Sequence, residues 1–494
     1  MAKIKNIFIP IIFFSLTFIF FYNLQFTTAN IPGYDGYYHI KIAEILKNEG
    51  FIRKFPWLQM TDLKNHFVDQ HFLYHILLIP FTYFGLINGA KLSAVFFASV
   101  MALAFYLFLK GAGIRFPVIW SLGLLSSSYP FLFRMCLPKA PAIALIFLFA
   151  GLYTIFKKKY FMLALVSFCF VWLYVGFTII ILFSVLAFLG IFLVKRTLEV
   201  KTILFPLAGS AAGLIINPYF PYNLKFIFIQ TTKAGISRVV RGGGEWQNYD
   251  PFLLLKGSFF LFLILIISFI VFKKSKRKIG CETVTLILIS ASLLLMTLKS
   301  KRFVEFFIPF TLLTSSFLVK DAKERLFSSG YKLGIYTKFL AYFLLIFILA
   351  GFAKYQFNMT QKDLISDQRP VDRYKGAATW LENFTPASTV YTTDWDDFPE
   401  LFFYNSKNRY LIGLDPAFFY LYDERLYKKW DLINSGQFDK NLYDALAKDF
   451  KTPYVFTDSS HKEFIRAADK SPYLRLEYAD QYSRIYALIR GKES

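Results

Sequence analysis

The sequence predicts a polytopic α-helical membrane protein with about 11 transmembrane helices, followed by a C-terminal exported α/β domain. Of its 494 residues, 56% are hydrophobic and 20% are aromatic, which is more apolar than the composition of water-soluble proteins. Apolar runs separated by short basic stretches recur up to about Ala353, and beyond Met359 no run is long enough to span a bilayer. We therefore expect a membrane domain over residues 1–355 and a soluble domain over residues 356–494.

The formal net charge of +23 is carried by lysines and arginines that lie in short runs between the apolar segments. At such positions basic residues set the membrane topology and contact lipid phosphates. We expect a membrane partner and no nucleic-acid partner, because the sequence offers no soluble basic domain for nucleic acid. The three cysteines are scattered through apolar or junction sequence, so they predict neither a disulfide framework nor a zinc site.

The chain begins with the basic stretch MAKIKN and an apolar run from Ile7 to about Leu24. This run is too long for a signal peptide and no small-residue cleavage site follows it, so we expect a retained transmembrane helix with a cytoplasmic N-terminus. The polar loop 28–75 is then exported. Within it, Pro32 and Gly33 predict a turn, and Tyr37–Leu46 has the apolar spacing of a helix that lies along the membrane surface.

The basic runs decide how the later apolar segments cross the membrane. By the positive-inside rule, four runs are expected in the cytoplasm: Lys157–Lys159, Lys195–Arg196, Lys273–Lys278 and Lys320–Arg325. All four can lie there only if one apolar segment before Lys157 does not cross. The best candidate is Phe72–Ile87, which is short and carries His75 and Pro80. The C-terminus is then expected outside.

The C-terminal part has the mixed pattern of a soluble α/β domain of about 130 residues. Alternating stretches predict strands over Ser388–Thr392 and Pro453–Thr457. Helical patterns surround them over Val371–Asn383, Glu424–Asn434 and Asn441–Phe450. Because no low-complexity linker precedes this part, we expect it to pack directly on the membrane domain.

The loop 28–75 is the predicted catalytic loop, since it gathers four of the five histidines with three aspartates. Asp35 follows the predicted turn, just outside the first helix, at the height of a lipid phosphate. We expect it to be the central carboxylate, which takes a proton from an acceptor hydroxyl. The alternative is that Asp35 only caps a helix that begins near Gly36.

Asp69 forms a second predicted catalytic group together with His71. Two residues apart, these side chains can share a proton or orient a substrate, and we expect His71 and His39 to bind substrate. His71 and His75 would share one face of a helix, where they could hold a divalent metal with Asp69 or Asp35. A simple packing role for the histidines remains the alternative.

Three exported stretches break the positive-inside trend, and cations there are explained by an anionic lipid phosphate. The residues expected to bind substrate are Arg134 and Lys139, Arg238 and Arg241, and Arg302 with Glu305. Arg302 is the leading candidate for the phosphate, with Glu305 holding its guanidinium, while the glycine-rich loop after Arg241 is expected to close over the donor. The alternatives are cations that neutralise ordinary headgroups and an ordinary surface loop.

The order of an N-terminal helix, a first loop with an early Asp in YDGYYHIKIAEILKNEG, many spans and a C-terminal domain resembles the GT-C superfamily of polyprenyl-phosphate-dependent glycosyltransferases. Within it, the chain is most similar to the catalytic subunit of oligosaccharyltransferase. The segment AATWLENFTPASTVYTTDWDDF also resembles that subunit's soluble domain, where a helix and a strand lead to a WWDYG motif. The resemblance covers both ends, and the middle matches by hydropathy only.

Two departures from that family bear on the reaction. Asp394–Phe398 reads DWDDF, so the paired tryptophans that recognise a protein acceptor are incomplete. Arg134 and Lys139 stand where the family carries an acidic metal-binding motif, and replacing carboxylates by cations removes metal affinity there. A simpler transferase of polyprenyl-phosphate sugars therefore fits better than protein N-glycosylation.

We thus expect an integral membrane glycosyltransferase that moves a sugar from a polyprenyl-phosphate donor to a lipid, glycan or protein acceptor on the exported face of the inner or plasma membrane. The alternatives are oligosaccharyltransferase-like protein glycosylation, a transporter or flippase of lipid-linked glycans, and a non-catalytic assembly protein. Transporters tend to have duplicated halves, and the sequence shows no internal repeat. The cofactor is left open, with a divalent metal, Mg²⁺ or Mn²⁺, as the candidate.

Overall fold

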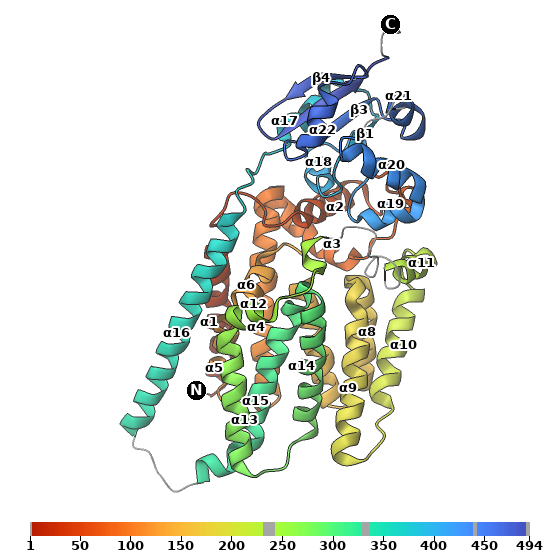
Figure 1. Ribbon diagram of the computed structural model, residues 1–494. Coiled ribbons are helices and arrows are strands. Elements are labelled where there is room, and N and C mark those ends of the chain that lie inside the picture. Colours follow the sequence, from red (N-terminus) through yellow and green to blue (C-terminus); the bar gives the residue numbers. More distant parts are fainter. Residues whose placement is uncertain (1, 231–242, 329–334, 438–441, 491–494) are drawn as a thin grey trace.

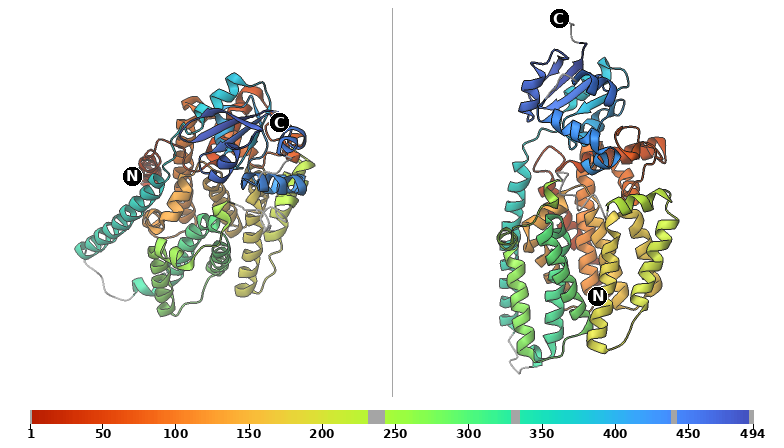
Figure 2. Two further views of the ribbon diagram at one scale, coloured as in Figure 1. Left: turned by 45° about the horizontal axis from the view of Figure 1, so that its top comes forward. Right: turned by 45° about the vertical axis from the view of Figure 1, so that its right-hand side comes forward.

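The computed structural model of the chain describes residues 2–230, 243–328, 335–437 and 442–490. It has a helical bundle with a smaller, sheet-containing part stacked on one end (Figure 1). Figure 2 shows the same stacking from two further directions. The longer helices of the bundle are α1 (Ala2–Gln25), α4 (Leu86–Gly111), α5 (Pro117–Ser127), α7 (Pro141–Phe156), α8 (Tyr160–Leu173), α9 (Thr178–Lys195), α10 (Lys201–Ile215), α13 (Phe259–Ser275), α14 (Cys281–Lys299), α15 (Val304–Ser328) and α16 (Ile335–Ser366).

Six of the described helices are long and apolar enough to cross a membrane. Two bent pairs would bring the number to eight: α6 (Tyr129–Cys136) with α7, bent by 111°, and α12 (Pro251–Gly257) with α13, bent by 83°. Four shorter apolar helices remain, one of them Phe72–Phe84, which comprises α3 (Phe72–Leu78) and the 3₁₀ helix η2 (Ile79–Phe84). The predicted number of about 11 requires three of these four to cross as well, so it stays a prediction.

The predicted cytoplasmic basic runs gather at the end of the bundle that lies away from the sheet. The α9–α10 and α13–α14 connections both lie at that end (Figure 1). Lys158 pairs there with Glu199, which ties the α7–α8 connection to the α9–α10 connection. Lys320 pairs with Glu282 at 2.9 Å. This common location is what the positive-inside argument requires, although it does not say on which side of the membrane this end lies.

The sheet-containing part has five strands in the order β2-β1-β3-β5-β4. β1 runs parallel to β2 and β3, whereas β5 runs antiparallel to β3 and β4. Its strands are β1 (Thr389–Thr392), β2 (Arg409–Tyr410), β3 (Tyr454–Asp458), β4 (Leu474–Ala479) and β5 (Ser483–Leu488). Its helices are α17 (Lys375–Phe384), α18 (Phe398–Tyr404), α19 (Pro416–Tyr422), α20 (Glu424–Asn434), α21 (Leu442–Asp444), the π-helical turn η7 (Ala445–Asp449) and α22 (Lys462–Ala468).

The predicted strands and α20 agree with these bounds to within a residue or two. α17 begins four residues later than predicted, at Lys375, because residues 371–374 form a turn. The predicted domain boundary at residues 355/356 falls inside α16, so the division into two domains stays a prediction.

The first loop is folded against the sheet-containing part. Leu58 forms a parallel bridge with Tyr410, and the backbone N–H of Tyr410 donates to the carbonyl of Trp57 at 2.7 Å. The loop thereby adds a short extended segment next to β2. One apolar cluster is shared by the two segments, with Phe55 from the loop and Phe402 from α18 both fully buried in it. The direct packing expected from the lack of a linker is therefore present, and it fixes the loop that carries the predicted catalytic residues.

Candidate active site

A cavity of about 600 Å³ lies where the first loop, the bundle and the sheet-containing part meet. Its lining residues extend from Asp35 to Phe418 in the sequence, and only the tertiary fold brings them together. Of the residues predicted from the sequence, its wall contains Asp35, His39, Asp69, His71, Arg134, Lys139 and Arg302. Glu305 lies behind the wall and is fully buried. Arg238 and Arg241 lie outside the described residues.

Asp35 is the first residue of α2 (Asp35–Glu49), where the positive end of the helix dipole favours a carboxylate. Gly33, with φ of +76°, makes the preceding turn. Gly36 lets the start of α2 approach the α6–α7 bend, because a Cβ there would lie 3.2 Å from Pro138 and 2.5 Å from Ile31. The Asp35 carboxylate is thus presented to Lys139, whose Nζ lies 2.6 Å from Oδ2.

The capping alternative for Asp35 does not match this geometry. The N-cap position of α2 is Tyr34, and no side chain within the described residues caps this helix end. The Asp35 side chain is 48% exposed and lines the cavity. Its carboxylate is therefore available to a bound molecule, apart from the contact with Lys139.

The cations of the cavity surround Glu245, which lies in the 3₁₀ turn η5 (Gly244–Trp246). Its Oε2 lies 2.7 Å from Arg134 Nη1 and 3.5 Å from Lys139 Nζ, and its Oε1 lies 3.9 Å from Arg302 Nη1. Burial opposes ionisation of Glu245, but Lys139, Arg134 and Arg302 together hold its pKa well below its usual value. A negative group at this point is therefore strongly stabilised.

The predicted pairing of Arg302 with Glu305 is wrong. Glu305 Oε2 instead accepts from Arg134 Nε at 2.7 Å. Arg302 lies in the 3₁₀ turn η6 (Lys301–Phe303), one element before Glu305 in α15, and donates to the Tyr174 hydroxyl at 2.8 Å. This turn directs Arg302 away from Glu305 and over the ring of Trp246, 4.3 Å from the ring centroid.

Arg134 was also expected in an exported loop and lies instead in α6. The 111° bend between α6 and α7 puts this arginine at the cavity wall, where a helix end and not a loop holds it. Ser128 caps the helix by accepting from the N–H of Phe131. The guanidinium is thereby held between two carboxylates, those of Glu245 and Glu305.

The predicted pairing of Asp69 with the His71 ring is also not what the structure shows. Asp69 Oδ1 accepts from the backbone N–H of His71 at 2.9 Å, and Oδ2 lies 2.6 Å from Nδ1 of His75. Nε2 of His75 in turn lies 2.8 Å from Nδ1 of His39. Asp69 is thus paired with the buried ring of His75, which lies one helical turn after His71.

The metal site considered from the sequence is not formed by these side chains. No three His, Cys, Asp or Glu groups in the described part of the chain are arranged as metal ligands. His71 precedes α3, and its ring centroid lies 6.1 Å from that of His75, whose two nitrogens already have partners. Burial and the His75 ring lower the pKa of His71 to about 3, while Asp69 and Asp35 oppose this shift. His71 therefore lines the cavity as a neutral ring.

The residues of the wall that were not predicted from the sequence as site residues include Tyr174, Glu245, Trp246 and Asp415. Asp415 caps α19 by accepting from the N–H of Ala417 at 2.8 Å, and burial raises its pKa to about 6 although this hydrogen bond opposes the shift. It brings the sheet-containing part into the cavity wall. The only sequence signal was the Asp-Pro pair at a helix start, which is common to many helices without function.

The DWDDF segment, Asp394–Phe398, joins β1 to α18 and does not line this cavity. Asp397 is buried, and the Tyr374 hydroxyl donates to its Oδ1 at 2.5 Å. Burial, with Asp458, Asp396 and Asp394 nearby, raises the pKa of Asp397 well above its usual value. Asp397 therefore holds the interior of the sheet-containing part together.

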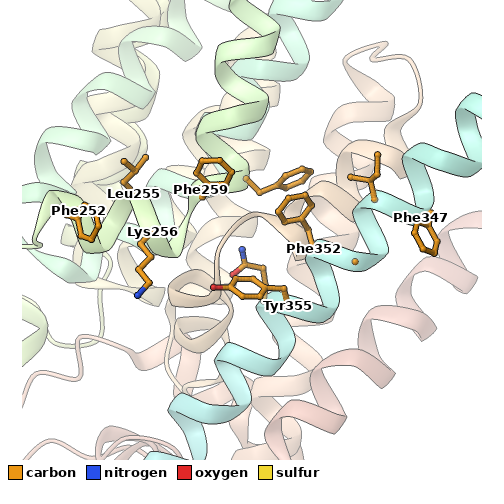
Figure 3. Close-up of a pocket in the computed structure, with 11 residues that line it drawn as sticks. Phe252, Leu255, Lys256, Phe259, Phe347, Phe352 and Tyr355 are labelled. Carbon is orange, nitrogen blue, oxygen red and sulfur yellow. The ribbon is translucent and has the colours of Figure 1, made fainter.

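A second cavity of about 740 Å³ lies between α12–α13 and α16 (Figure 3). The side chains that border it are almost all apolar: Phe252, Leu255 and Phe259 from α12–α13, and Phe347, Phe352 and Tyr355 from α16. Lys256 is the only charged residue among the described side chains of its wall. Such a surface suits hydrocarbon, whereas group transfer needs several polar groups, so the first cavity is the candidate active site.

No family model matches the sequence, and no curated protein matches it. Solved structures do match. The archaeal oligosaccharyltransferase AglB from Archaeoglobus fulgidus, in complex with an inhibitory peptide and a dolichol-phosphate, has a TM-score of 0.65 and 11% identity, over 99% of this chain and 75% of that one.

Two other glycosyltransferases are similar over almost all of this chain. ArnT from Cupriavidus metallidurans, bound to undecaprenyl phosphate, has a TM-score of 0.61 and 13% identity, over 97% of each chain. The arabinofuranosyltransferase AftD from Mycobacteria has a TM-score of 0.60 and 11% identity, over 96% of this chain and 40% of that one. At such identities the likeness shows the fold, and the fold is the one that the two ends of the sequence predicted: this chain has the fold of the GT-C glycosyltransferases.

Proposed function

We propose that this protein is a membrane glycosyltransferase that moves a sugar from a polyprenyl-phosphate donor to a hydroxyl-bearing acceptor. The observation that carries the proposal is the cavity in which Asp35 lies beside three cations, Arg134, Lys139 and Arg302. Transfer needs a group that engages the acceptor hydroxyl and cations that stabilise the phosphate as it leaves. Dolichol-phosphate and undecaprenyl phosphate bound to two proteins of the same fold support this class of donor.

In this proposal the donor phosphate lies among Arg134, Lys139 and Arg302, and Asp35 holds the acceptor hydroxyl next to the sugar. Glu245 already shows that this place stabilises a negative group, since three cations contact it. The oligosaccharyltransferase-like alternative has one observation in its favour, the contribution of the sheet-containing part to the cavity wall through Asp415. The DWDDF segment does not line the cavity, so we prefer a simpler acceptor than a protein sequon.

The test of the proposed function is a transfer assay with the full-length protein in nanodiscs and polyprenyl-phosphate sugars of different headgroups. Mass spectrometry of glycolipids and surface glycans from a deletion strain and its parent identifies the headgroups and acceptors to try. Transfer of at least one sugar is expected. Unchanged glycans in the deletion strain and no transfer of any donor, with detectable movement of the lipid across the bilayer, would favour a flippase.

The cavity is expected to face the exported side, with the basic runs in the cytoplasm. In a variant without the three native cysteines, Ser460→Cys in the sheet-containing part should react with a membrane-impermeant thiol reagent in intact cells. Lys158→Cys should react only after permeabilisation. Both side chains are exposed, so access to the side chain itself does not limit either reaction. The opposite pattern would place the site on the cytoplasmic face.

Arg302→Lys is expected to raise the KM for the lipid donor about tenfold, with a much smaller effect on the KM for the acceptor. Lysine keeps the positive charge but loses the planar fork that binds phosphate, the hydrogen bond to Tyr174 and the stacking on Trp246. Tyr174→Phe is the matched control, since it removes only the hydrogen bond and should change the donor KM less. Equal effects of Arg302→Lys on both substrates would make Arg302 a structural residue.

A further inference from the structure

Three buried side chains form a hydrogen-bonded chain that ends at the cavity. Asp69 Oδ2 lies 2.6 Å from His75 Nδ1, and His75 Nε2 lies 2.8 Å from His39 Nδ1. Asp69 and His39 are each 5% exposed and His75 is not exposed at all. Asp69 and His39 belong to the cavity wall, whereas His75 lies behind it and connects them. The metal-binding and packing roles considered from the sequence do not account for this connection.

With Asp69 ionised and His75 neutral, both hydrogen bonds of the chain have a single direction. An ionised carboxylate only accepts, so Nδ1 of His75 must donate to it. Nε2 of a neutral His75 is then an acceptor, and Nδ1 of His39 must donate to that nitrogen. The remaining nitrogen of His39, Nε2, therefore carries a lone pair. It has no hydrogen-bond partner within the described residues, and His39 lines the cavity.

Asp35 lies one helical turn before His39 on α2, and both line the cavity. Unlike Nε2 of His39, the Asp35 carboxylate already has a cation as its partner, since its Oδ2 lies 2.6 Å from Nζ of Lys139. His39 has no such cation within hydrogen-bond distance in the described structure. The group best placed to receive a proton is therefore the ring and not the carboxylate.

We propose that His39 Nε2 takes the proton of the acceptor hydroxyl, with His75 and Asp69 as positioning residues that fix the His39 tautomer and share the charge. This inference rests on the proposed glycosyl transfer. As the proton moves to Nε2, the hydroxyl oxygen forms its bond to the anomeric carbon of the sugar. The bond from that carbon to the phosphate oxygen breaks, and its electron pair leaves with the polyprenyl phosphate, which the three cations stabilise.

The positive charge gained by His39 is then spread along the chain. The Nδ1 proton of His39 can pass to His75 Nε2, which leaves His39 neutral and places an imidazolium against the Asp69 carboxylate. Asp35 holds the hydroxyl in position. The product is the glycosylated acceptor and the polyprenyl phosphate, and the proton returns to water after release.

The surroundings of His39 keep its ring neutral before the reaction, as a proton acceptor must be. Tyr38 from α2 and Tyr74 from α3 flank it, with ring centroids at 5.4 and 5.2 Å, and His71 lies at 5.0 Å. Burial, followed by His75, His71 and Lys139, holds the pKa of His39 well below its usual value. The negative phosphate of a bound donor acts in the opposite sense and favours the imidazolium as transfer proceeds.

The first test reads the tautomer directly and needs no activity. In the full-length protein labelled with ¹⁵N-histidine and reconstituted in nanodiscs, the nitrogen signals of the five histidines are assigned with single His→Gln variants. His39 is expected to show a protonated Nδ1 and a bare Nε2. In Asp69→Asn the amide can donate to His75 Nδ1, which reverses both hydrogen bonds, so His39 Nε2 should become protonated.

The second test is the pH dependence of turnover. Asp69→Asn is expected to lower kcat by about 100-fold with little change in either KM. His75→Gln can still donate to Asp69 and accept from His39, so it keeps the tautomer but cannot take the proton, and kcat should fall about tenfold. Its acid limb should shift to higher pH, because the His75 ring that helps to lower the pKa of His39 is gone. His66→Gln is the matched control and should change nothing, since His66 is exposed and stacks on Tyr222 outside this cavity.

The outcomes separate this inference from the proposed function. A protonated His39 Nε2 in the unmodified protein, or identical histidine spectra for it and Asp69→Asn, would overturn the proton chain whatever the enzyme does. A kcat that Asp69→Asn leaves unchanged would overturn it as well. Absence of any sugar transfer by the unmodified protein, together with the expected tautomer, would instead reject the proposed function and leave the hydrogen-bond order standing.

Discussion

Asp35→Asn should reduce sugar transfer by about 100-fold or more while expression and thermal stability stay near those of the unmodified protein. Asparagine has the same volume, but it lacks the charge that holds the acceptor hydroxyl and it cannot form the ion pair with Lys139 at 2.6 Å. The effect on stability should be small, since the Asp35 side chain is half exposed and Lys139 keeps Glu245 as a second partner at 3.5 Å. The measurement is single-turnover transfer in nanodiscs alongside a thermal unfolding curve.

Asp62→Asn provides the matched control for this loop. Asp62 also pairs with a lysine, Lys225, at 2.8 Å, but it is 61% exposed and does not line the active-site cavity. Transfer by Asp62→Asn should therefore equal that of the unmodified protein. If Asp35→Asn kept more than about a tenth of the activity, a direct part for this carboxylate in the reaction would be excluded.

The sequence was most informative about the first loop, because its residue types are so unusual between two apolar segments. Five of the predicted site residues come from this loop. Asp35, His39, Asp69 and His71 line the cavity, and His75 lies behind its wall. The residue types of this loop and their spacing were enough to select them. Which of them contact one another was not predictable, because α2 and α3 are separated by a loop whose path is set by packing against the sheet-containing part.

The ion pairs of the cavity were also not predictable from the sequence. The sequence places Arg302 three residues before Glu305, a spacing at which helical side chains meet. The 3₁₀ turn at Lys301–Phe303 directs Arg302 away from Glu305. The α6–α7 bend brings Arg134, 171 positions away in the sequence, close enough to pair with Glu305. No local pattern specifies such a bend, since Pro138 alone is compatible with a turn, a kink or a helix start. Glu245 and Asp415 were missed for the same reason.

The Arg134–Glu305 pair should be the most sensitive contact of the cavity to a single substitution. Arg134→Ala is expected to destabilise the protein by about 3–5 kcal/mol, because it leaves a carboxylate buried without its cation. Glu305 is fully buried, its Oε2 accepts from Arg134 Nε at 2.7 Å, and its Oε1 has no partner in the described structure. The control is the surface pair Arg466–Glu463, which is 2.8 Å apart with both side chains about two-thirds exposed. Arg466→Ala should lower the free energy of unfolding by less than about 1 kcal/mol.

The double variant Arg134→Met, Glu305→Leu separates the stability of this pair from its function. Apolar side chains of similar volume remove both charges together, so most of the lost stability should return. Transfer should not return, because Arg134 also contacts Glu245 at 2.7 Å in the place proposed for the donor phosphate. The measurement is a double-mutant cycle of thermal unfolding and of donor KM. If the double variant is as unstable as Arg134→Ala, the lost stability comes from lost packing around Arg134. If the double variant transfers sugar normally, Arg134 is not part of the phosphate site.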